Sequence, residues 1–435
     1  MGKKERVWFE QAEGFLDPGL VQELRMLRKK TSDEENAALP VIVRFNHQAE
    51  KERREEAIRF CQDGSCDRVE GELAFLGGIY GSLSPATIKN LVKHEGVAKI
   101  YYDREVKALL DMASKSIGAL DVQVKDGLTG KGVTIAVVDT GIHPHDDLMK
   151  PTMRIKAFVD LVAKEKDSYD DQGHGSHCAG NAAGNGGLSE GLYTSPAPEA
   201  DLVGVKVLDA EGSGRLSTVI QGVEWCVRHR KELGIRVLSL SLGAPAFESY
   251  RDDPLCQAVE KAWHSGIVVC AAAGNEGPYP MTIGTPGIDP LIITVGSADD
   301  KNTEDRQDDQ KAPYSSRGPT FDFLVKPDIY APGTNIVSLS VPGSPLEKQL
   351  PENRVGDHYI SLSGTSMATP ICAGVAALML EANPALSPND VKAILMDTSQ
   401  VLRGDQAGYI DVRAAVALAK EYAAFQGVTA GSPGN

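Results

Sequence analysis

The chain has few aromatic residues and lacks any long apolar run. Of its 435 residues, 42% are hydrophobic, 24% are charged and 6% are aromatic, which is ordinary for a soluble globular protein. No segment reaches the ~18 consecutive apolar residues of a membrane span. The start, Met1 to Arg6, is charged, and the roughly 7–15 apolar residues of a secretory signal do not follow it. We therefore expect no membrane partner and a cytoplasmic location.

Positive charge is in short supply. Lys and Arg number 45 against 60 Asp and Glu, so the net charge is −15 at pH 7 and the pI is about 5.1. Binding to nucleic acid needs a basic surface that neutralises phosphates. The composition therefore excludes nucleic acid as the main partner. The length allows one large domain of roughly 250–300 residues together with a smaller one.

Cysteine is present in an odd number, seven, and several cysteines lie in apolar runs such as residues 267–270. This pattern favours buried free thiols in a reducing compartment. Cys61 and Cys66 flank a short polar segment and leave open a small loop disulfide or half of a metal site. A second pair at zinc-ligand spacing is missing, so a zinc site is not favoured.

The first hundred residues alternate short strands and helices. Strands are expected at 40–45 and 97–102, a polar helix at 48–62, a hairpin at 73–80, and a second helix that opens with Ser84-Pro85 as cap and first-turn proline. The order β-α-β-β-α-β is that of a small ferredoxin-like α+β sandwich.

Beyond residue 110 the pattern changes to buried strand runs, at 133–138, 201–208 and 237–242, that alternate with helical segments. Such runs predict an α/β domain with a parallel sheet covered by helices on both faces. Functional groups in such domains collect where the strands end. Asp139 and Asn275 each follow a predicted strand.

The change of character near residue 110 divides the chain into three parts. We predict a small N-terminal domain over residues 1–109, a larger α/β domain over 110–425, and a flexible tail over 426–435.

Three polar motifs could carry chemistry, and each has a simpler explanation when taken alone. Asp139 in Val137–Ile142 could form a turn. Ser366, within Ser363–Pro370, could simply be the cap of the helix that follows, with Pro370 in the first turn of that helix. His174 stands within the segment Asp171–Gly180.

His174 could also belong to a metal site together with neighbouring histidines and carboxylates, namely His143, His145, Asp146, Asp147, Asp171 and His177. The two histidine pairs lie in separate loops, and neither has the His-Glu-x-x-His spacing of a zinc helix. A base at His174 and a packed histidine at position 177 is the more economical interpretation.

Taken together, Asp139, His174 and Ser366 supply a carboxylate, an imidazole and a hydroxyl, the three groups that make a serine nucleophilic. Their order along the chain and the motifs around them resemble the subtilisin family of serine proteases. The resemblance covers most of residues 97–415. It implies a subtilisin-type three-layer catalytic domain and an endopeptidase that needs no cofactor for its chemistry.

The resemblance also implies roles for further segments. Asn275, within residues 271–277, corresponds to the side-chain donor of an oxyanion hole, and the backbone N–H of Ser366 is its partner. Two segments correspond to the edges that hold an extended peptide: Gly212, Ser213 and Gly214, and Ser241, Leu242 and Gly243. A roomy pocket walled by Ala272, Ala273, Gly274 and Gly284 is expected to take apolar residues before the scissile bond, because no Asp or Glu clearly stands at its base.

Subtilisins are made with an inhibitory propeptide that assists folding, and residues 1–109 resemble one. The segment 97–109 is similar to the strand that lies in the active site as a product. This similarity predicts self-cleavage between Leu109 and Leu110, with Val106 in a second apolar subsite. The long, domain-sized propeptide is most similar to that of the intracellular AprX-like group.

Calcium is left open by the resemblance. Asp147 stands where the carboxylate of a structural calcium site is expected, although the loop at 181–198 differs from the usual calcium loop. Cys178 lies beside the catalytic histidine, which suggests sensitivity to mercurials.

Two other classes of protein are weighed against the protease. A catalytically silent scaffold would be expected to lose at least one triad residue. A nucleotide-binding protein is suggested by Gly127 to Gly132, but this segment lacks Ser or Thr after Lys131 and has the wrong glycine spacing for a phosphate loop.

Overall fold

The computed structural model describes most of the chain, and its contacts divide the chain into two compact units, Met1–Val106 and Lys107–Asn435. The described residues are 8–10, 12, 14–16, 18–30, 37–46, 51–61, 67–73, 78–102, 110–246, 248–402 and 405–429. Val106 and Leu109 lie outside the described residues, so the subsite and cleavage predicted there stay predictions.

The first unit contains one antiparallel sheet with the strand order β2-β3-β1-β4. Its elements are the 3₁₀ helix η1 (Trp8–Glu10), α1 (Pro18–Lys30), β1 (Leu39–Phe45), α2 (Lys51–Phe60), β2 (Arg68–Leu73), β3 (Gly78–Leu83), α3 (Pro85–Leu91) and β4 (Val97–Tyr102). The order β1-α2-β2-β3-α3-β4 confirms the predicted ferredoxin-like sandwich. As expected, Ser84 caps α3: its side chain accepts a hydrogen bond from the N–H of Thr87 at 3.3 Å.

This unit has a hydrophobic core of its own. Val41 from the sheet and Ile88 from α3 are fully buried in it, and Leu20 and Leu24 of α1 join them. The segment before the first strand is therefore part of the same folding unit.

The second unit is built on a large sheet with the order β16-β17-β12-β10-β9-β8-β5-β7-β6. Its strands are β5 (Thr134–Asp139), β6 (Ile155–Asp160), β7 (Asp201–Lys206), β8 (Ile235–Leu240), β9 (Val268–Ala272), β10 (Ile293–Asp299), β12 (Ile329–Pro332), β16 (Gln400–Val401), β17 (Gly408–Tyr409) and, beside β10, β11 (Gln310–Lys311). All pairs from β6 to β17 are parallel, whereas β11 and β16 pair antiparallel. A small second sheet holds β13 (Ile336–Leu339), β14 (Arg354–Val355) and β15 (Tyr359–Leu362).

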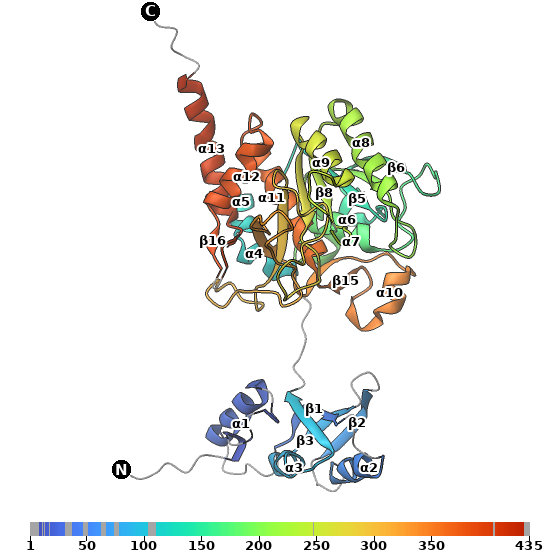
Figure 1. The fold of residues 1–435 in the computed structure, drawn as a ribbon, viewed down its shortest axis with the longest axis vertical. Helices are drawn as coiled ribbons and strands as arrows, with labels where there is room; N and C mark the ends of the chain where they lie inside the picture. Colours follow the sequence, from blue (N-terminus) through green and yellow to red (C-terminus); the bar gives the residue numbers. More distant parts are fainter. Residues whose placement is uncertain are drawn as a thin grey trace, which may run out of the picture. The chain divides into compact units, whose positions relative to one another are not determined.

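Helices cover the large sheet on both faces (Figure 1). They are α4 (Leu110–Ser116), α5 (Ala119–Asp126), α6 (Asp146–Met149), α7 (His174–Ala183), η3 (Gly187–Ser189), α8 (Leu216–Leu233), α9 (Pro254–His264), α10 (Pro345–Gln349), η4 (Pro351–Asn353), α11 (Thr365–Ala382), α12 (Pro388–Asp397) and α13 (Val412–Thr429). Helices α7 and α11 pack together, as do α8 and α9. Every residue of β5 is buried, as expected of a central strand covered on both faces. The predicted α/β layering is confirmed.

Helix α11 is long and apolar enough to cross a membrane by length and composition, but 83% of it is buried inside the domain. It is a core helix. It begins at Thr365, so Pro370 is its sixth residue, and the predicted first-turn position is wrong. Pro370 instead removes the N–H that would bond to the carbonyl of Ser366.

The six described cysteines are buried and free, as predicted. Cys61 is among them, whereas Cys66 lies outside the described residues.

Candidate active site

An aspartate and a histidine meet at the carboxyl end of the central strand. Asp139 is the last residue of β5 and is fully buried, and His174 is the first residue of α7. The imidazole Nδ1 donates to the Asp139 carboxylate at 2.8 Å, so Nε2 is free to accept a proton. Gly173, with φ of +111°, turns the chain into α7 in a conformation that favours glycine.

The close approach of α7 to this strand end requires glycine at position 175. A Cβ atom there would lie 2.2 Å from the carbonyl oxygen of Gly141. The local sequence Gly173-His174-Gly175 therefore allows both the turn and the tight packing that bring the imidazole to Asp139.

The environment of His174 favours the charged imidazole. Burial alone would lower its pKa, but the Asp139 carboxylate counteracts this, and the pKa of His174 is raised well above its usual value. Asp139 Oδ1 is held in turn by the N–H of Thr140 at 2.7 Å.

Ser366, the second residue of α11, lies near this pair. Cys178 of α7 links them: its thiol is 3.8 Å from His174 Nδ1 and donates to the carbonyl of Ser366 at 3.4 Å. That carbonyl is the one left without a helical partner by Pro370. The Ser366 hydroxyl itself donates to the carbonyl of Ser241 at 3.0 Å rather than to the imidazole.

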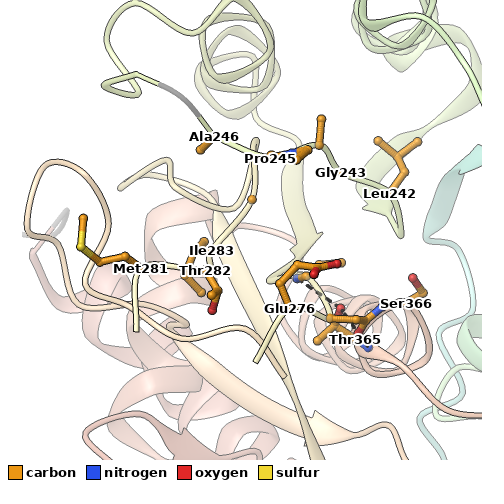
Figure 2. Close-up of a pocket in the computed structure, with 15 residues that line it drawn as sticks. Leu242, Gly243, Pro245, Ala246, Glu276, Met281, Thr282, Ile283, Thr365 and Ser366 are labelled. Carbon is orange, nitrogen blue, oxygen red and sulfur yellow. Dashed lines mark hydrogen bonds between the residues drawn. The ribbon is translucent and has the colours of Figure 1, made fainter. Parts of the chain in front are cut away.

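Two hydrogen-bond donors, the side-chain amide of Asn275 and the backbone N–H of Ser366, belong to residues that line the same cavity; Ser366 is labelled in Figure 2. The Asn275 amide oxygen accepts from the N–H and the hydroxyl of Thr365 at 2.9 and 3.1 Å, so its NH₂ group is turned away from the helix. Within the described part of the chain the N–H of Ser366 has no partner, whereas those of Met367 and Ala368 bond to Gly364. The arrangement can stabilise a negatively charged oxygen.

A cavity of about 320 Å³ opens beside Asn275 and Ser366. Its lining includes three of the predicted wall residues, Ala272, Gly274 and Gly284. Ala273 does not line it; the side chain is buried in a small core cluster with Cys256, Ile283 and Ile288. Glu276 does line it (Figure 2), which corrects the expectation of a pocket without a carboxylate.

A second cavity of about 510 Å³ adjoins the first, since both are lined by Leu242, Gly243 and Ala244. His174 and all six residues of the predicted substrate edges line this second cavity: Gly212, Ser213, Gly214, Ser241, Leu242 and Gly243. The structure thus brings the predicted edges to the imidazole.

A buried aspartate that the sequence analysis did not single out shapes the loop before His174. Asp170 accepts five hydrogen bonds of 2.7–3.0 Å, from the hydroxyls of Thr140 and Ser176 and the N–H groups of Gln172, Gly173 and Ser176. The two adjacent aspartates, Asp170 and Asp171, could have indicated a structural carboxylate before His174. Nothing in the sequence says which of the two points inward.

The other histidines do not form a metal site with His174. His177 is buried and donates to the carbonyls of Ile336 and Ile360, and His145 caps α6. Among the described residues, three possible ligands meet only at Asp139, His174 and Cys178. Burial raises the pKa of the Cys178 thiol, which disfavours the thiolate that a metal would need.

Asp147 does not fit a calcium ion in this structure. Its two carboxylate oxygens accept from the N–H of Leu188 at 2.9 Å and the hydroxyl of Tyr359 at 2.7 Å. The buried guanidinium of Arg154 donates to its backbone carbonyl. Calcium needs six to eight oxygen ligands, whereas donors occupy this carboxylate.

Comparison with known proteins identifies the family. The model of the subtilase family, Peptidase_S8, matches residues 130–421. The chain belongs to the subtilase family. The serine protease AprX of Bacillus subtilis (strain 168) is 46% identical over 365 residues, which cover 82% of each chain. Subtilisin E of the same strain is 32% identical, over 80% of this chain and 83% of that protein.

Solved structures agree with this assignment. A cold-adapted subtilisin-like serine proteinase matches with 30% identity and a TM-score of 0.50, over 65% of this chain and 88% of that one. Sphericase matches with 31% identity and a TM-score of 0.52, over 66% and 91%. This subtilase has the subtilisin-like fold and is a serine protease, as the sequence predicts.

Proposed function

We propose that this subtilase is an endopeptidase in which Asp139, His174 and Ser366 form the catalytic triad. The observation that carries the proposal is the Asp139–His174 pair at 2.8 Å, which the Cys178 thiol links to the backbone carbonyl of Ser366. Asn275 and the Ser366 N–H would form the oxyanion hole.

In this mechanism the Ser366 hydroxyl rotates from the Ser241 carbonyl to His174 Nε2. The imidazole takes the hydroxyl proton while Oγ attacks the peptide carbonyl, and Asp139 stabilises the imidazolium. The oxyanion lies between the Asn275 NH₂ and the Ser366 N–H. His174 then protonates the leaving amine, which leaves an acyl group on Ser366. Water, activated by the same imidazole, releases it.

Substrate would lie extended along the two cavities. The edges at Gly212–Gly214 and Ser241–Gly243 present backbone groups that can pair with a peptide strand. The smaller cavity has apolar walls and accepts apolar residues before the scissile bond, and Glu276 lets it accept a basic residue as well.

The first substrate would be the chain itself. Residues 1–109 fit an inhibitory propeptide that is cut between Leu109 and Leu110, since the first unit has the ferredoxin-like topology and its own core. Six buried free thiols support a cytoplasmic enzyme, because a reducing compartment keeps thiols unpaired.

One substitution tests the nucleophile. Ser366→Ala should abolish hydrolysis of peptides and release of the N-terminal unit. Ser363→Ala is the matched control, since its hydroxyl accepts from Asn335 on the surface and takes no part in the proposed chemistry. Peptide hydrolysis at the wild-type rate by a purified Ser366→Ala protein would refute the assignment.

A further inference from the structure

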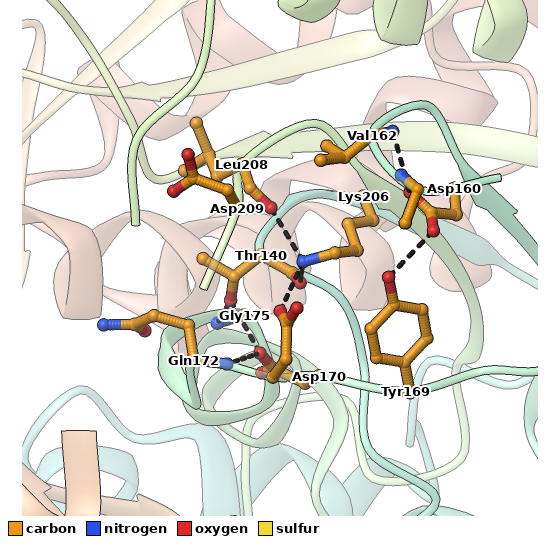
Figure 3. Close-up of polar contacts among 12 residues, drawn as sticks. Thr140, Asp160, Val162, Tyr169, Asp170, Gln172, Gly175, Lys206, Leu208 and Asp209 are labelled. Carbon is orange, nitrogen blue, oxygen red and sulfur yellow. Dashed lines mark hydrogen bonds and ion pairs between the residues drawn. The ribbon is translucent and has the colours of Figure 1, made fainter. Parts of the chain in front are cut away.

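A fully buried lysine lies next to the catalytic strand end. Lys206 is the last residue of β7, paired with Asp139 of β5 in the sheet. Its ammonium group donates three hydrogen bonds, to the carbonyls of Thr140 at 2.7 Å and Leu208 at 2.8 Å and to Asp171 at 2.5 Å (Figure 3). An ammonium has three donors, and all three are used here. The Tyr169 ring lies 5.2 Å away.

The three acceptors come from three different loops. Thr140 follows Asp139 directly, Asp171 stands three residues before His174, and Leu208 begins the segment that leads to Gly212–Gly214. Thr140 and Leu208 also line the cavity next to His174. Burying a charge is costly unless it is paired and hydrogen-bonded, so Lys206 holds these acceptors in a fixed relation.

We propose that Lys206 is a positioning residue that sets the substrate edge at Gly212–Gly214 in register with the Asp139–His174 pair. The inference rests on the proposed function. In this proposal the buried Lys206 ammonium connects the catalytic groups to the edge that binds substrate residues further from the scissile bond.

The shape of the edge itself does not depend on Lys206. Asp209 accepts hydrogen bonds from the N–H groups of Glu211 and Ser213 at 3.1 and 2.9 Å, and its own N–H donates to the Ser213 carbonyl at 2.8 Å. These contacts close the turn. Loss of Lys206 should therefore move the edge as a unit relative to His174 without unravelling it.

The loop before His174 likewise has its own support, from Asp170. That carboxylate accepts hydrogen bonds from the Thr140 hydroxyl, the Ser176 hydroxyl and the loop N–H groups, and none of its described hydrogen bonds comes from residues 208–214. The N–H groups of Val207 and Leu208 tie the start of the edge segment to the Asp139 carbonyl, at 2.9 and 3.3 Å. Among the described hydrogen bonds, the Lys206 ammonium is what ties Leu208 to the loop before His174, through Asp171.

The test compares peptides of different length. In the wild type, kcat/KM should rise when a substrate is extended from one to four residues before the scissile bond, because the longer peptide pairs with the edge. Lys206→Met keeps the length of the side chain but removes its donors. In this variant the ratio of kcat/KM for the long peptide to that for the short one should fall at least tenfold, mostly because KM for the long peptide rises. The matched control is Lys156→Met on β6, whose ammonium pairs with Asp201 at 3.3 Å on the surface and should leave the gain unchanged.

The same variants separate positioning from a purely electrostatic role. Removing a positive charge that acts on His174 would raise the pKa of the imidazole and move the acid limb of kcat/KM to higher pH. We expect the limb to stay within 0.3 pH unit, an order-of-magnitude tolerance for a group already paired with Asp171. A large shift of the limb, or an equal loss for short and long peptides, would overturn the proposal.

Asp171→Asn is a second variant that tests the proposal if Lys206→Met does not fold. It removes the charged acceptor at the half-exposed end of the network and should reduce the length gain in part. If the gain is unchanged in this variant, the proposal is wrong. A wild-type protein that hydrolyses neither peptide would instead contradict the proposed function.

Discussion

His174 determines how the proposed activity depends on pH. The base must be neutral to accept the Ser366 proton, and the pKa of His174 is raised well above its usual value of about 6.5. The acid limb of kcat/KM should therefore lie above pH 6.5. A pH–rate profile with short peptides measures it, and a midpoint at or below 6.5 would contradict the role of Asp139.

The Asp139–His174 ion pair should affect stability in the opposite direction to activity: activity rises with pH, whereas the contribution of the pair to stability falls. Because the folded pKa of His174 exceeds the unfolded value, its contribution to stability is fully present below pH 6.5 and is lost as pH rises through the folded pKa. In the Ser366→Ala background, which prevents self-digestion, Asp139→Asn should remove this contribution at pH 6 and have a smaller effect at high pH. Urea unfolding at the two pH values compares them.

The Asn275 amide should contribute to the chemical step rather than to substrate binding. Asn275→Ala removes the side-chain donor and should lower kcat by a factor of about 10²–10³, the size measured for this donor in subtilisin, with little change in KM. Thr365→Val, which removes only one of the two contacts that orient the amide, should cost less. A loss confined to KM would place Asn275 in ground-state binding instead.

At the scale of elements, α7 is tied to the small sheet by His177. Asn181 donates to its Nδ1, so Nε2 carries the proton and donates to the carbonyls of Ile336 in β13 and Ile360 in β15. Burial lowers the pKa of His177 to about 3. Below pH 6.5 His177 binds a proton in the unfolded chain but not in the folded one. The free energy of unfolding should therefore fall by up to about 1.4 kcal/mol for each unit by which the pH is lowered.

Urea unfolding of Ser366→Ala between pH 7 and pH 4 measures this loss. His177→Gln keeps a donor for the two carbonyls but cannot titrate. It should be less stable at pH 7 and show a flatter dependence on pH. An equally steep dependence in both proteins would assign the acid sensitivity to other groups.

The loop after α7 should be held by Tyr359 rather than by calcium at Asp147. Tyr359→Phe removes the hydroxyl that donates to this carboxylate and should lower the free energy of unfolding by about 1–3 kcal/mol. Adding calcium should not restore it. Recovery of the melting temperature in millimolar calcium would show that the carboxylate can take the ion once the donor is gone.

Sequence patterns predict the elements well because strands buried on both faces have continuous apolar runs. Asp139 and Asn275 could be predicted at one edge of the sheet because parallel strands end at the same edge. The position of Pro370 could not, since it depends on where α11 begins. Neither could the inward turn of Asp170 or the burial of Lys206, because both depend on contacts between loops far apart in the sequence.

At the scale of the whole molecule, the chain combines two units with separate cores. The core of the first unit includes α1 and the sheet, and the core of the second surrounds β5 and α11. A unit with its own core can remain folded after the chain is cut. This property fits the proposed role of residues 1–109 as a propeptide released by cleavage.

The proposed cut between Leu109 and Leu110 can be followed directly. Wild-type protein incubated after purification should mature to a form that begins at Leu110, while Ser366→Ala stays intact, because the cut needs the chain's own nucleophile. Leu109→Asp should slow maturation, since a carboxylate fits poorly in an apolar pocket lined by Glu276. N-terminal sequencing and intact mass measure the product. A start outside about residues 105–116, or an unchanged rate of maturation in the Ser366→Ala protein, would exclude self-processing at this site and leave residues 1–109 without the proposed role.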